Sequence, residues 1–331
     1  MGFERHRVTW WGRADEVTLI TFMPRFPHRL PLSGNGRGWF VDLHLPADAR
    51  IEYRLEVRRG DVTETTLDPA NDRVASNPYG HNSVLSGSEY PSPTPGPSIE
   101  WRSREFRVPS VAFGGRRHHR LLSPSDVGDQ EPLPLVMLHD GSDHLVHGAI
   151  APRLGAAIRS GALPPLRVAL LDPRRRHDEY TGDPHHAAHV ALEVLPHVAK
   201  RVAVDDRRVL GGSSLGAVAA WHAAHSHPGI FTGLILQSGT FAFTRHPEVS
   251  PDMARPIGAF LEAAVAAPRA ECLAIAQTCG RFESLVDWNR RAAAVLSGAA
   301  DLHRYEERWT GHDWGAWGDM LPAALAFALR E

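Results

Sequence analysis

Residues 1–90 show an alternation of apolar and polar positions. The alternation is clearest in Val17–Phe22, Trp39–Leu45 and Ile51–Val57, which are separated by turns rich in Pro, Gly and Asp. Because successive side chains of a strand point to opposite faces, this period of two is typical of strands with one buried face. We therefore expect a small N-terminal β-sandwich domain over residues 1–90.

A proline-rich segment ends this pattern. Residues 91–98 read Pro-Ser-Pro-Thr-Pro-Gly-Pro-Ser. Proline has no amide hydrogen and a fixed φ, so the segment neither pairs in a sheet nor continues a helix. We interpret residues 91–98 as a linker and expect a second domain over residues 99–331.

Residues 99–331 alternate short apolar runs with longer Ala- and Leu-rich stretches. The runs that are typical of buried strands are Pro134–His139, Leu166–Leu171, Arg208–Gly211, Gly233–Gln237 and Leu273–Ala276. The stretches with a helical pattern are Ala187–Val202, Leu215–His225 and Asp287–Leu296. Buried strands that alternate with helices predict an α/β fold with a mostly parallel sheet, covered on both faces.

The segment after the Arg208–Gly211 strand carries the clearest chemical motif. It contains Gly212-x-Ser214-x-Gly216 and is followed by a helical pattern. A glycine on each side lets strand and helix approach, so the serine hydroxyl stands at the helix N-terminus, where developing negative charge is stabilised. This nucleophile-elbow pattern predicts Ser214 as a catalytic nucleophile and an α/β-hydrolase fold.

A histidine and an acid follow in the order that this fold requires. His312 comes after the last predicted strand, Tyr305–Trp309, where a general base is expected. Glu283 follows the penultimate strand and is our candidate for orienting the imidazole. Asp287, one helical turn further on, is the alternative acid.

Two backbone amides are expected to form the oxyanion hole. The elbow supplies the amide of Leu215. The second donor is expected in the loop after an early strand, His139–Asp143. We choose the Ser142 amide, because Gly141 gives the backbone room to bend.

The motifs of both regions resemble those of the enterochelin (ferric enterobactin) esterases, in which an N-terminal sandwich precedes an esterase-D-like hydrolase domain. The resemblance covers nearly the whole chain and rests on Met23-Pro24-Arg25, Gly38-Trp39, Leu45–Asp48, Tyr53-Arg54, Leu67–Asn71, His139-Asp140-Gly141, the elbow around Ser214, and Gly311-His312-Asp313-Trp314. It implies hydrolysis of the trilactone ester bonds of a ferric catecholate siderophore, with release of iron in the cytoplasm. The family's nucleophile, base and acid fall on Ser214, His312 and Glu283.

The resemblance also implies where the substrate binds. The family's basic patch matches Asp172–Tyr180, which follows the carboxyl end of a predicted strand, the edge at which open sheets bind ligands. Arginines there suit an anionic ferric catecholate, whereas the alternative is a solvated charge run paired with its acidic neighbours. The expected substrate contacts are Arg174, Arg175, Arg176, Asp140, Gly141 and Trp314.

Composition narrows the remaining classes of function. A formal net charge of −2 over 331 residues gives no overall attraction to nucleic acid or an anionic membrane. The two cysteines, Cys272 and Cys279, suit a reducing compartment, and Met1–Thr9 lacks the apolar core of a signal peptide. We expect a cytoplasmic protein with a small-molecule substrate, no cofactor, and no nucleic-acid or membrane partner. The oligomeric state is left open.

Other residue groups are given ordinary roles. The clustered histidines form no zinc signature, so we expect surface histidines and no metal; they are His118, His119, His185, His186, His189, His222, His225 and His227. Packing in the core is preferred over a sugar platform for Trp10, Trp11 and Trp39. Two alternatives to the siderophore esterase remain: a serine esterase for carbohydrate-linked or other aromatic esters, and a non-catalytic binding protein on a hydrolase scaffold.

Overall fold

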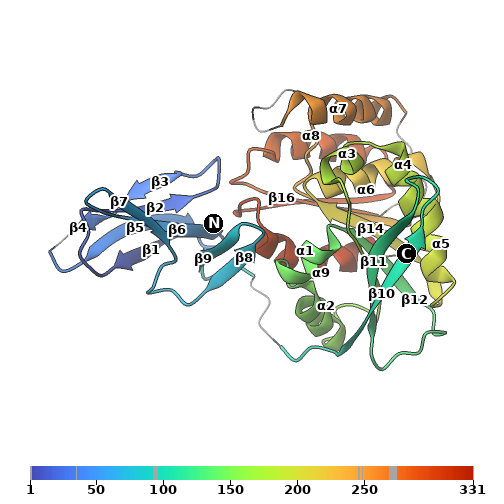
Figure 1. The fold of residues 1–331 in the computed structure, drawn as a ribbon, viewed down its shortest axis with the longest axis horizontal. Coiled ribbons are helices and arrows are strands. Elements are labelled where there is room, and N and C mark those ends of the chain that lie inside the picture. Colours follow the sequence, from blue (N-terminus) through green and yellow to red (C-terminus); the bar gives the residue numbers. More distant parts are fainter. Residues whose placement is uncertain are drawn as a thin grey trace.

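The computed structural model describes residues 2–34, 36–91, 96–244, 247, 249–267 and 274–330. Figure 1 shows a smaller all-β part beside a larger α/β part, with the C-terminus in the larger one. We call these the N-terminal β region (residues 2–90) and the α/β region (residues 99–330). Residues 92–95 of the predicted linker, and Cys272, lie outside the described residues.

The N-terminal β region consists of two antiparallel sheets. One has the strand order β1-β5-β4; the other has the order β3-β2-β6-β9-β8, with β7 paired to β6. The strands are β1 (Phe3–Trp10), β2 (Glu16–Thr21), β3 (Arg29–Pro31), β4 (Ser33–Gly34), β5 (Trp39–Pro46), β6 (Arg50–Arg59), β7 (Val62–Thr66), β8 (Val74–Asn77) and β9 (Gly80–Ser86).

A shared apolar core joins the two sheets. Leu19 of β2, Leu45 of β5 and Leu55 of β6 are buried in one cluster, and burying each such side chain contributes roughly 1.5–3 kcal/mol. The same cluster includes Phe282, with Trp309 packed against it, both from the α/β region. The two regions are therefore in direct apolar contact.

The three tryptophans of the N-terminal β region have different environments. Trp10 is buried in the core and Trp39 packs against it, as expected. Trp11 is 64% exposed, so the expectation of core packing is wrong for this residue. Its neighbour Trp10 already fills the inward position of the alternating pattern, which directs Trp11 outward.

The α/β region is built on one eight-stranded sheet with the order β10-β11-β13-β12-β14-β15-β16-β17. The pairs β10/β11 and β11/β13 are antiparallel, whereas the pairs from β13 to β17 are parallel. The sheet is thus mixed, and the predicted mostly parallel sheet did not include its antiparallel edge. The strands are β10 (Trp101–Pro109), β11 (Arg116–Pro124), β12 (Leu133–His139), β13 (Arg167–Leu171), β14 (Val204–Ser213), β15 (Gly233–Gln237), β16 (Ala274–Gly280) and β17 (Leu302–Arg308).

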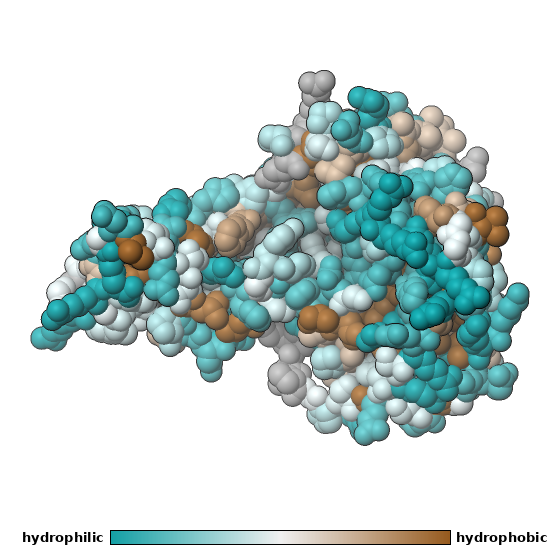
Figure 2. All heavy atoms as spheres, viewed as in Figure 1, coloured by the Kyte–Doolittle hydropathy of each residue, from teal (hydrophilic) through white to brown (hydrophobic). Residues whose placement is uncertain are grey.

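The antiparallel edge is a hairpin of two strands, β10 and β11, which the apolar pattern did not predict. Gly114 and Gly115, at φ of +70° and +76°, turn the chain between β10 and β11, a conformation that glycine adopts without strain. Both strands carry three arginines, and β11 also carries two histidines, so they lack the long apolar runs that marked the other strands. Figure 2 shows hydrophilic residues gathered over this hairpin on the face in view.

Helices cover both faces of this sheet. Along β12, Leu135 and Met137 belong to one apolar cluster, whereas Val136 and Leu138 belong to a second cluster with α2 and α9. Among the described residues, no helix is both long and apolar enough to span a membrane. The helices are α1 (Gly141–Val146), α2 (Ile150–Arg159), α3 (Arg176–Tyr180), α4 (Pro184–Ala188), the π-helix η1 (His189–Val194), α5 (Leu195–Ala199), α6 (Leu215–Ser226), α7 (Pro251–Ala266), α8 (Val286–Ser297) and α9 (Trp314–Ala328).

Candidate active site

The predicted catalytic residues follow strands that end at one edge of the sheet. Ser214 comes directly after β14, Glu283 after β16 and His312 after β17, and β15 lies between β14 and β16. Because these strands are parallel neighbours, their carboxyl ends meet at the same edge. Residues separated by nearly a hundred positions in the sequence are thereby brought to one place.

The elbow has the geometry that the motif predicted. Ser214 has φ 59° and ψ −121°, a conformation that non-glycine residues seldom adopt, and α6 begins at the next residue, Leu215. A Cβ atom on Gly212 would lie 2.5 Å from the carbonyl carbon of Gly216. Only glycine at position 212 therefore lets strand and helix approach this closely, and the Ser214 hydroxyl is presented at the N-terminus of a 12-residue helix.

Glu283 and His312 form a close pair. The Oε2 atom of Glu283 lies 2.7 Å from Nδ1 of His312. The other carboxylate oxygen accepts hydrogen bonds from Ser238 Oγ at 2.6 Å and from the Gly280 amide at 2.7 Å. The Glu283 side chain is 1% exposed, so it is held in a fixed position. Since a carboxylate only accepts, Nδ1 carries the proton and Nε2 is free to act as a base.

Asp287, the alternative acid, has other partners. Its side chain is 65% exposed and forms ion pairs with Arg25 and Arg290. It lies in the first turn of α8, where its carboxylate points to these arginines. The structure therefore brings Glu283, and not Asp287, to the imidazole.

Ser214 and His312 are connected through residues that the sequence did not single out. The Ser214 hydroxyl is 3.2 Å from the Thr240 hydroxyl, and no hydrogen bond joins the described side chains of Ser214 and His312. The Ser214 amide donates to the carbonyl of Gln237 at 2.8 Å, and the Gln237 side chain donates to the carbonyl of Trp317 at 2.9 Å. The Trp317 indole in turn contacts the His312 ring edge-on, with centroids 4.7 Å apart.

This chain of contacts links Ser214 and His312 at the sheet edge where β14 and β17 end. The hydrogen bond between a nucleophile and its base commonly tightens only when substrate binds. Thr240 and Trp317 carried no sequence signal of their own, because a threonine in a loop and a tryptophan in an apolar helix are common.

The two expected oxyanion donors differ in their surroundings. Leu215 opens α6 directly after Ser214. The amide of Ser142 donates to Asp172 Oδ1 at 2.9 Å, and its hydroxyl donates to Oδ2 at 2.6 Å. Ser142 is thus not a free donor here, and an oxyanion would have to displace the Asp172 carboxylate. Asp172 follows β13, which pairs with β12 in the sheet. The sequence alone does not predict that these two strands are neighbours.

The arginine run is mostly engaged with the protein itself. Arg176 forms a bidentate ion pair with Asp140, with Nε–Oδ1 and Nη2–Oδ2 distances of 2.8 and 2.7 Å. Burial raises the pKa of the Asp140 carboxyl, and Arg176 opposes that rise. Arg174 donates to the Arg116 carbonyl at 2.9 Å, and Arg175, which is largely exposed, pairs with the exposed Asp178. Two expected substrate contacts, Asp140 and Arg176, therefore bind each other.

The remaining expected substrate contacts lie on packed elements. A Cβ atom on Gly141 would lie 2.5 Å from Cα of Leu170, so this glycine permits α1 to pack against β13. Trp314 contacts the rings of His144 and Trp317 edge-on, at centroid distances of 5.0 and 4.9 Å. It is half-buried and opens α9, and its partner Trp317 contacts the His312 ring.

Several histidines expected on the surface are buried, which corrects that expectation. Nε2 of His119 lies 3.2 Å from Nε2 of His189, and Nε2 of His139 lies 3.0 Å from Nε2 of His186. Burial lowers the pKa of His119 to about 3. His119 lies on β11 and His189 opens η1, so their contact depends on strand order. Within the described part of the chain, no group of three or more potential ligands could hold a metal ion.

The fold and the sheet edge define the class: the chain is an α/β-hydrolase-type protein with an N-terminal β region. The Esterase family model, described as "Putative esterase", matches residues 110–328. The chain therefore belongs to this esterase family and is a carboxylic ester hydrolase. No curated protein matches the chain.

Solved structures share the fold. The ferric enterobactin esterase of Salmonella typhimurium has a TM-score of 0.82 and 19% identity, covering 99% of this chain and 94% of that one. The enterobactin esterase of Shigella flexneri, in the presence of enterobactin, has a TM-score of 0.79 and 21% identity, covering 98% and 95%. A ferulic acid esterase has a TM-score of 0.58 and 18% identity, covering 70% of this chain and 98% of that one. These likenesses confirm the α/β-hydrolase fold with an N-terminal β part.

Proposed function

We propose that this esterase uses Ser214 as nucleophile, His312 as general base and Glu283 as the acid that orients the imidazole. The observation that carries the proposal is the juxtaposition, on one sheet edge, of a strained serine elbow and an imidazole paired with a buried carboxylate. The combination supplies an activated nucleophile, a base in the correct tautomer and a helix N-terminus for developing charge.

In the first half of the reaction, the Ser214 oxygen attacks the ester carbonyl and its proton passes to Nε2 of His312. The tetrahedral oxyanion is stabilised by the Leu215 amide and, once Asp172 is displaced, by the Ser142 amide. His312 then gives the proton to the leaving alcohol, and an acyl-enzyme on Ser214 remains. In the second half, His312 takes a proton from water as its oxygen attacks the acyl carbonyl. The bond from the acyl carbon to the Ser214 oxygen then breaks, His312 returns the proton to that oxygen, and the acid is released.

For the substrate, we propose the trilactone esters of a ferric catecholate siderophore resembling enterobactin, hydrolysed in the cytoplasm. The proposal is supported by the likeness to enterobactin esterases, which extends over both regions of the chain. It is also supported by the arginines that follow β13, although Arg176 is partly neutralised by Asp140. The domain limits that go with it are 1–90 for the N-terminal domain, 91–98 for the linker and 99–331 for the catalytic domain.

The second candidate is an aromatic ester linked to a carbohydrate. It is favoured by the match to a ferulic acid esterase over 70% of the chain. The N-terminal β region would then bind sugar: Trp11 is exposed, and a nearby cavity of about 450 Å³ is lined by Arg13, Asp15, Trp39 and Arg59 among others. The ferulic acid esterase covers less of the chain than the enterobactin esterases do, so we place this candidate second.

Two experiments test the proposal. A fluorophosphonate probe should label the native protein and leave Ser214→Ala unlabelled; equal behaviour of the two would refute the serine mechanism and favour a binding protein. Purified enzyme should then be incubated with ferric enterobactin and with feruloyl sugars, and products quantified by chromatography. Faster turnover of the feruloyl sugars would replace the siderophore assignment with the second candidate.

A further inference from the structure

The segment that carries His312 is held from the N-terminal β region. We call residues 309–313, between β17 and α9, the His312 loop. The amide of Arg50, the first residue of β6, donates to the Trp309 carbonyl at 2.9 Å. The Arg50 guanidinium is ion-paired with Asp313, at the other end of the loop. Met23 packs on the middle of the loop, where a Cβ atom on Gly311 would lie 2.8 Å from Met23 Cγ.

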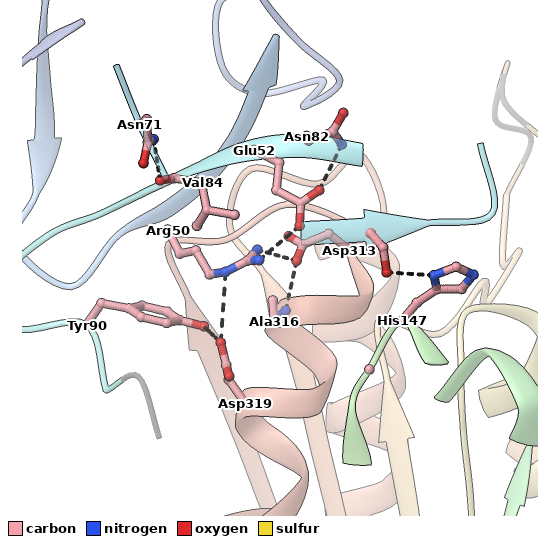
Figure 3. A network of polar contacts seen from close by, with 12 residues as sticks. Arg50, Glu52, Asn71, Asn82, Val84, Tyr90, His147, Asp313, Ala316 and Asp319 are labelled. Atoms are coloured by element: carbon pink, nitrogen blue, oxygen red, sulfur yellow. Dashed lines mark hydrogen bonds and ion pairs between the residues drawn. The ribbon is translucent and has the colours of Figure 1, made fainter. Parts of the chain in front are cut away.

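Arg50 is the centre of a buried polar network (Figure 3). Its side chain is 5% exposed and lies 2.9 Å from Glu52 and 3.9 Å from Asp319, in addition to its pair with Asp313. Asp319 also accepts a hydrogen bond from Tyr90 at 2.9 Å and pairs with Arg153. The Arg50 guanidinium therefore connects strand β6 to two acidic residues of α9: Asp313, which caps the helix, and Asp319, which lies within it.

Asp313 links this network to the imidazole. It follows His312 directly and caps α9, because its carboxylate accepts the Ala316 amide at 2.8 Å. Burial raises the pKa of the Asp313 carboxyl, the Arg50 charge lowers it, and Glu52 raises it further. Without Arg50, two buried carboxylates would face each other uncompensated, and the loop would have to move or take up a proton.

We propose that Arg50 is a positioning residue for catalysis: from the N-terminal β region it clamps both ends of the His312 loop and so keeps the imidazole aligned between Glu283 and Ser214. The N-terminal β region thereby takes part in the chemistry of the α/β region. The inference rests on the proposed function, in which His312 is the general base.

The clamp predicts a specific kinetic effect. Glu283 fixes only the Nδ1 side of the imidazole, so a loosened loop lets the ring pivot about that contact and moves Nε2 away from Ser214. A displacement of about 1 Å at a reacting group costs about 100-fold in rate. The loss should fall on kcat, because no contact to a small ester is removed.

The decisive variant is the full-length double substitution Arg50→Met/Glu52→Gln. It removes one charge of each sign, so Asp313 does not face a second uncompensated carboxylate, as it would in Arg50→Met alone. With p-nitrophenyl acetate as substrate, we expect kcat to fall about 10- to 100-fold while KM changes little. Arg50→Lys keeps the charge but loses the fork that reaches two carboxylates, so its kcat should be intermediate.

A matched control disturbs the same interface without touching the loop. Tyr90→Phe removes the hydrogen bond to Asp319 and leaves Asp313 paired, so kcat should match the native enzyme even where the melting temperature falls. A double variant and an Arg50→Lys variant that are folded by circular dichroism, yet have native kcat, would overturn the proposal.

Parallel assays of Ser214→Ala and His312→Ala distinguish a failure of the proposed function from a failure of the clamp. If these variants keep esterase activity, the proposed function fails. If they lose it while Arg50→Met/Glu52→Gln behaves like Tyr90→Phe, only the clamp is refuted.

Discussion

Replacing Glu283 by glutamine tests the catalytic arrangement most directly, because the structure dictates how the new amide must lie. The oxygen at the Oε1 position accepts from Ser238 and from the Gly280 amide, at 2.6 and 2.7 Å. Ser238 also accepts the Trp317 indole hydrogen at 2.9 Å, so its own proton is directed to position 283. In Glu283→Gln, the carbonyl oxygen must therefore stay at Oε1, and the NH₂ group must face His312.

That orientation reverses the tautomer of the imidazole. An NH₂ group donates to Nδ1, so the ring proton moves to Nε2, which is then unable to accept the Ser214 proton. The equivalent carboxylate-to-amide change in a serine protease lowers kcat about 10⁴-fold. This corresponds to about 5 kcal/mol of transition-state stabilisation, and we expect a loss of this order here.

The assay compares kcat of Glu283→Gln and Asp287→Asn on p-nitrophenyl acetate, with thermal unfolding followed in parallel. Glu283→Gln keeps the shape of the side chain, so its melting temperature should stay near the native value. Asp287→Asn removes only exposed ion pairs, which contribute about 0–1 kcal/mol, so its kcat should be near native. The reasoning is refuted if Asp287→Asn is the more damaging change, or if Glu283→Gln retains more than about a tenth of native kcat.

Three further predictions concern the elbow, the oxyanion site and pH. Gly212→Ala places a methyl group against Gly216 and should destabilise the protein by about 1–3 kcal/mol, with a larger loss of kcat; denaturant unfolding and ester hydrolysis measure both, and a fully active, stable variant contradicts the elbow geometry. Asp172→Ala frees the Ser142 amide and should raise kcat, whereas a fall would mean that Ser142 is not a donor. Burial lowers the pKa values of His119 and His144 to about 3, against about 6.5 when unfolded. The unfolded state thus binds more protons between these limits, and each histidine costs about 1.4 kcal/mol of stability per pH unit as pH falls below about 6.5. Urea unfolding at pH 7.5 and 5.5 checks this, and greater stability at the lower pH would contradict it.

The burial of these histidines is itself a result of strand order. His119 lies on β11 and meets His189 only because β11 pairs with the edge of the parallel strands and η1 packs behind it. Burial is predicted from the sequence by the spacing of apolar residues. A buried strand that carries histidine and arginine is therefore predicted to be exposed. The same limitation explains why the antiparallel edge of the sheet was not predicted.

Local sequence determined the fold class and the elbow that presents Ser214. The alternation of apolar runs and helical stretches depends on neighbours a few residues apart, and so does the glycine–serine–glycine turn that forces Ser214 to a positive φ. These features are fixed by local sterics and hydrophobic periodicity, which can be read along the chain.

Only the tertiary structure decided between Glu283 and Asp287, paired Arg176 with Asp140, engaged the Ser142 amide, and brought Arg50 to the His312 loop. Each of these depends on which strands become neighbours and on which buried charge finds a partner. A buried ionic group is stable only beside its counterpart, and that counterpart can lie anywhere in the sequence. Arg50 and Asp313 show this plainly, since one opens a strand of the N-terminal β region and the other caps the last helix.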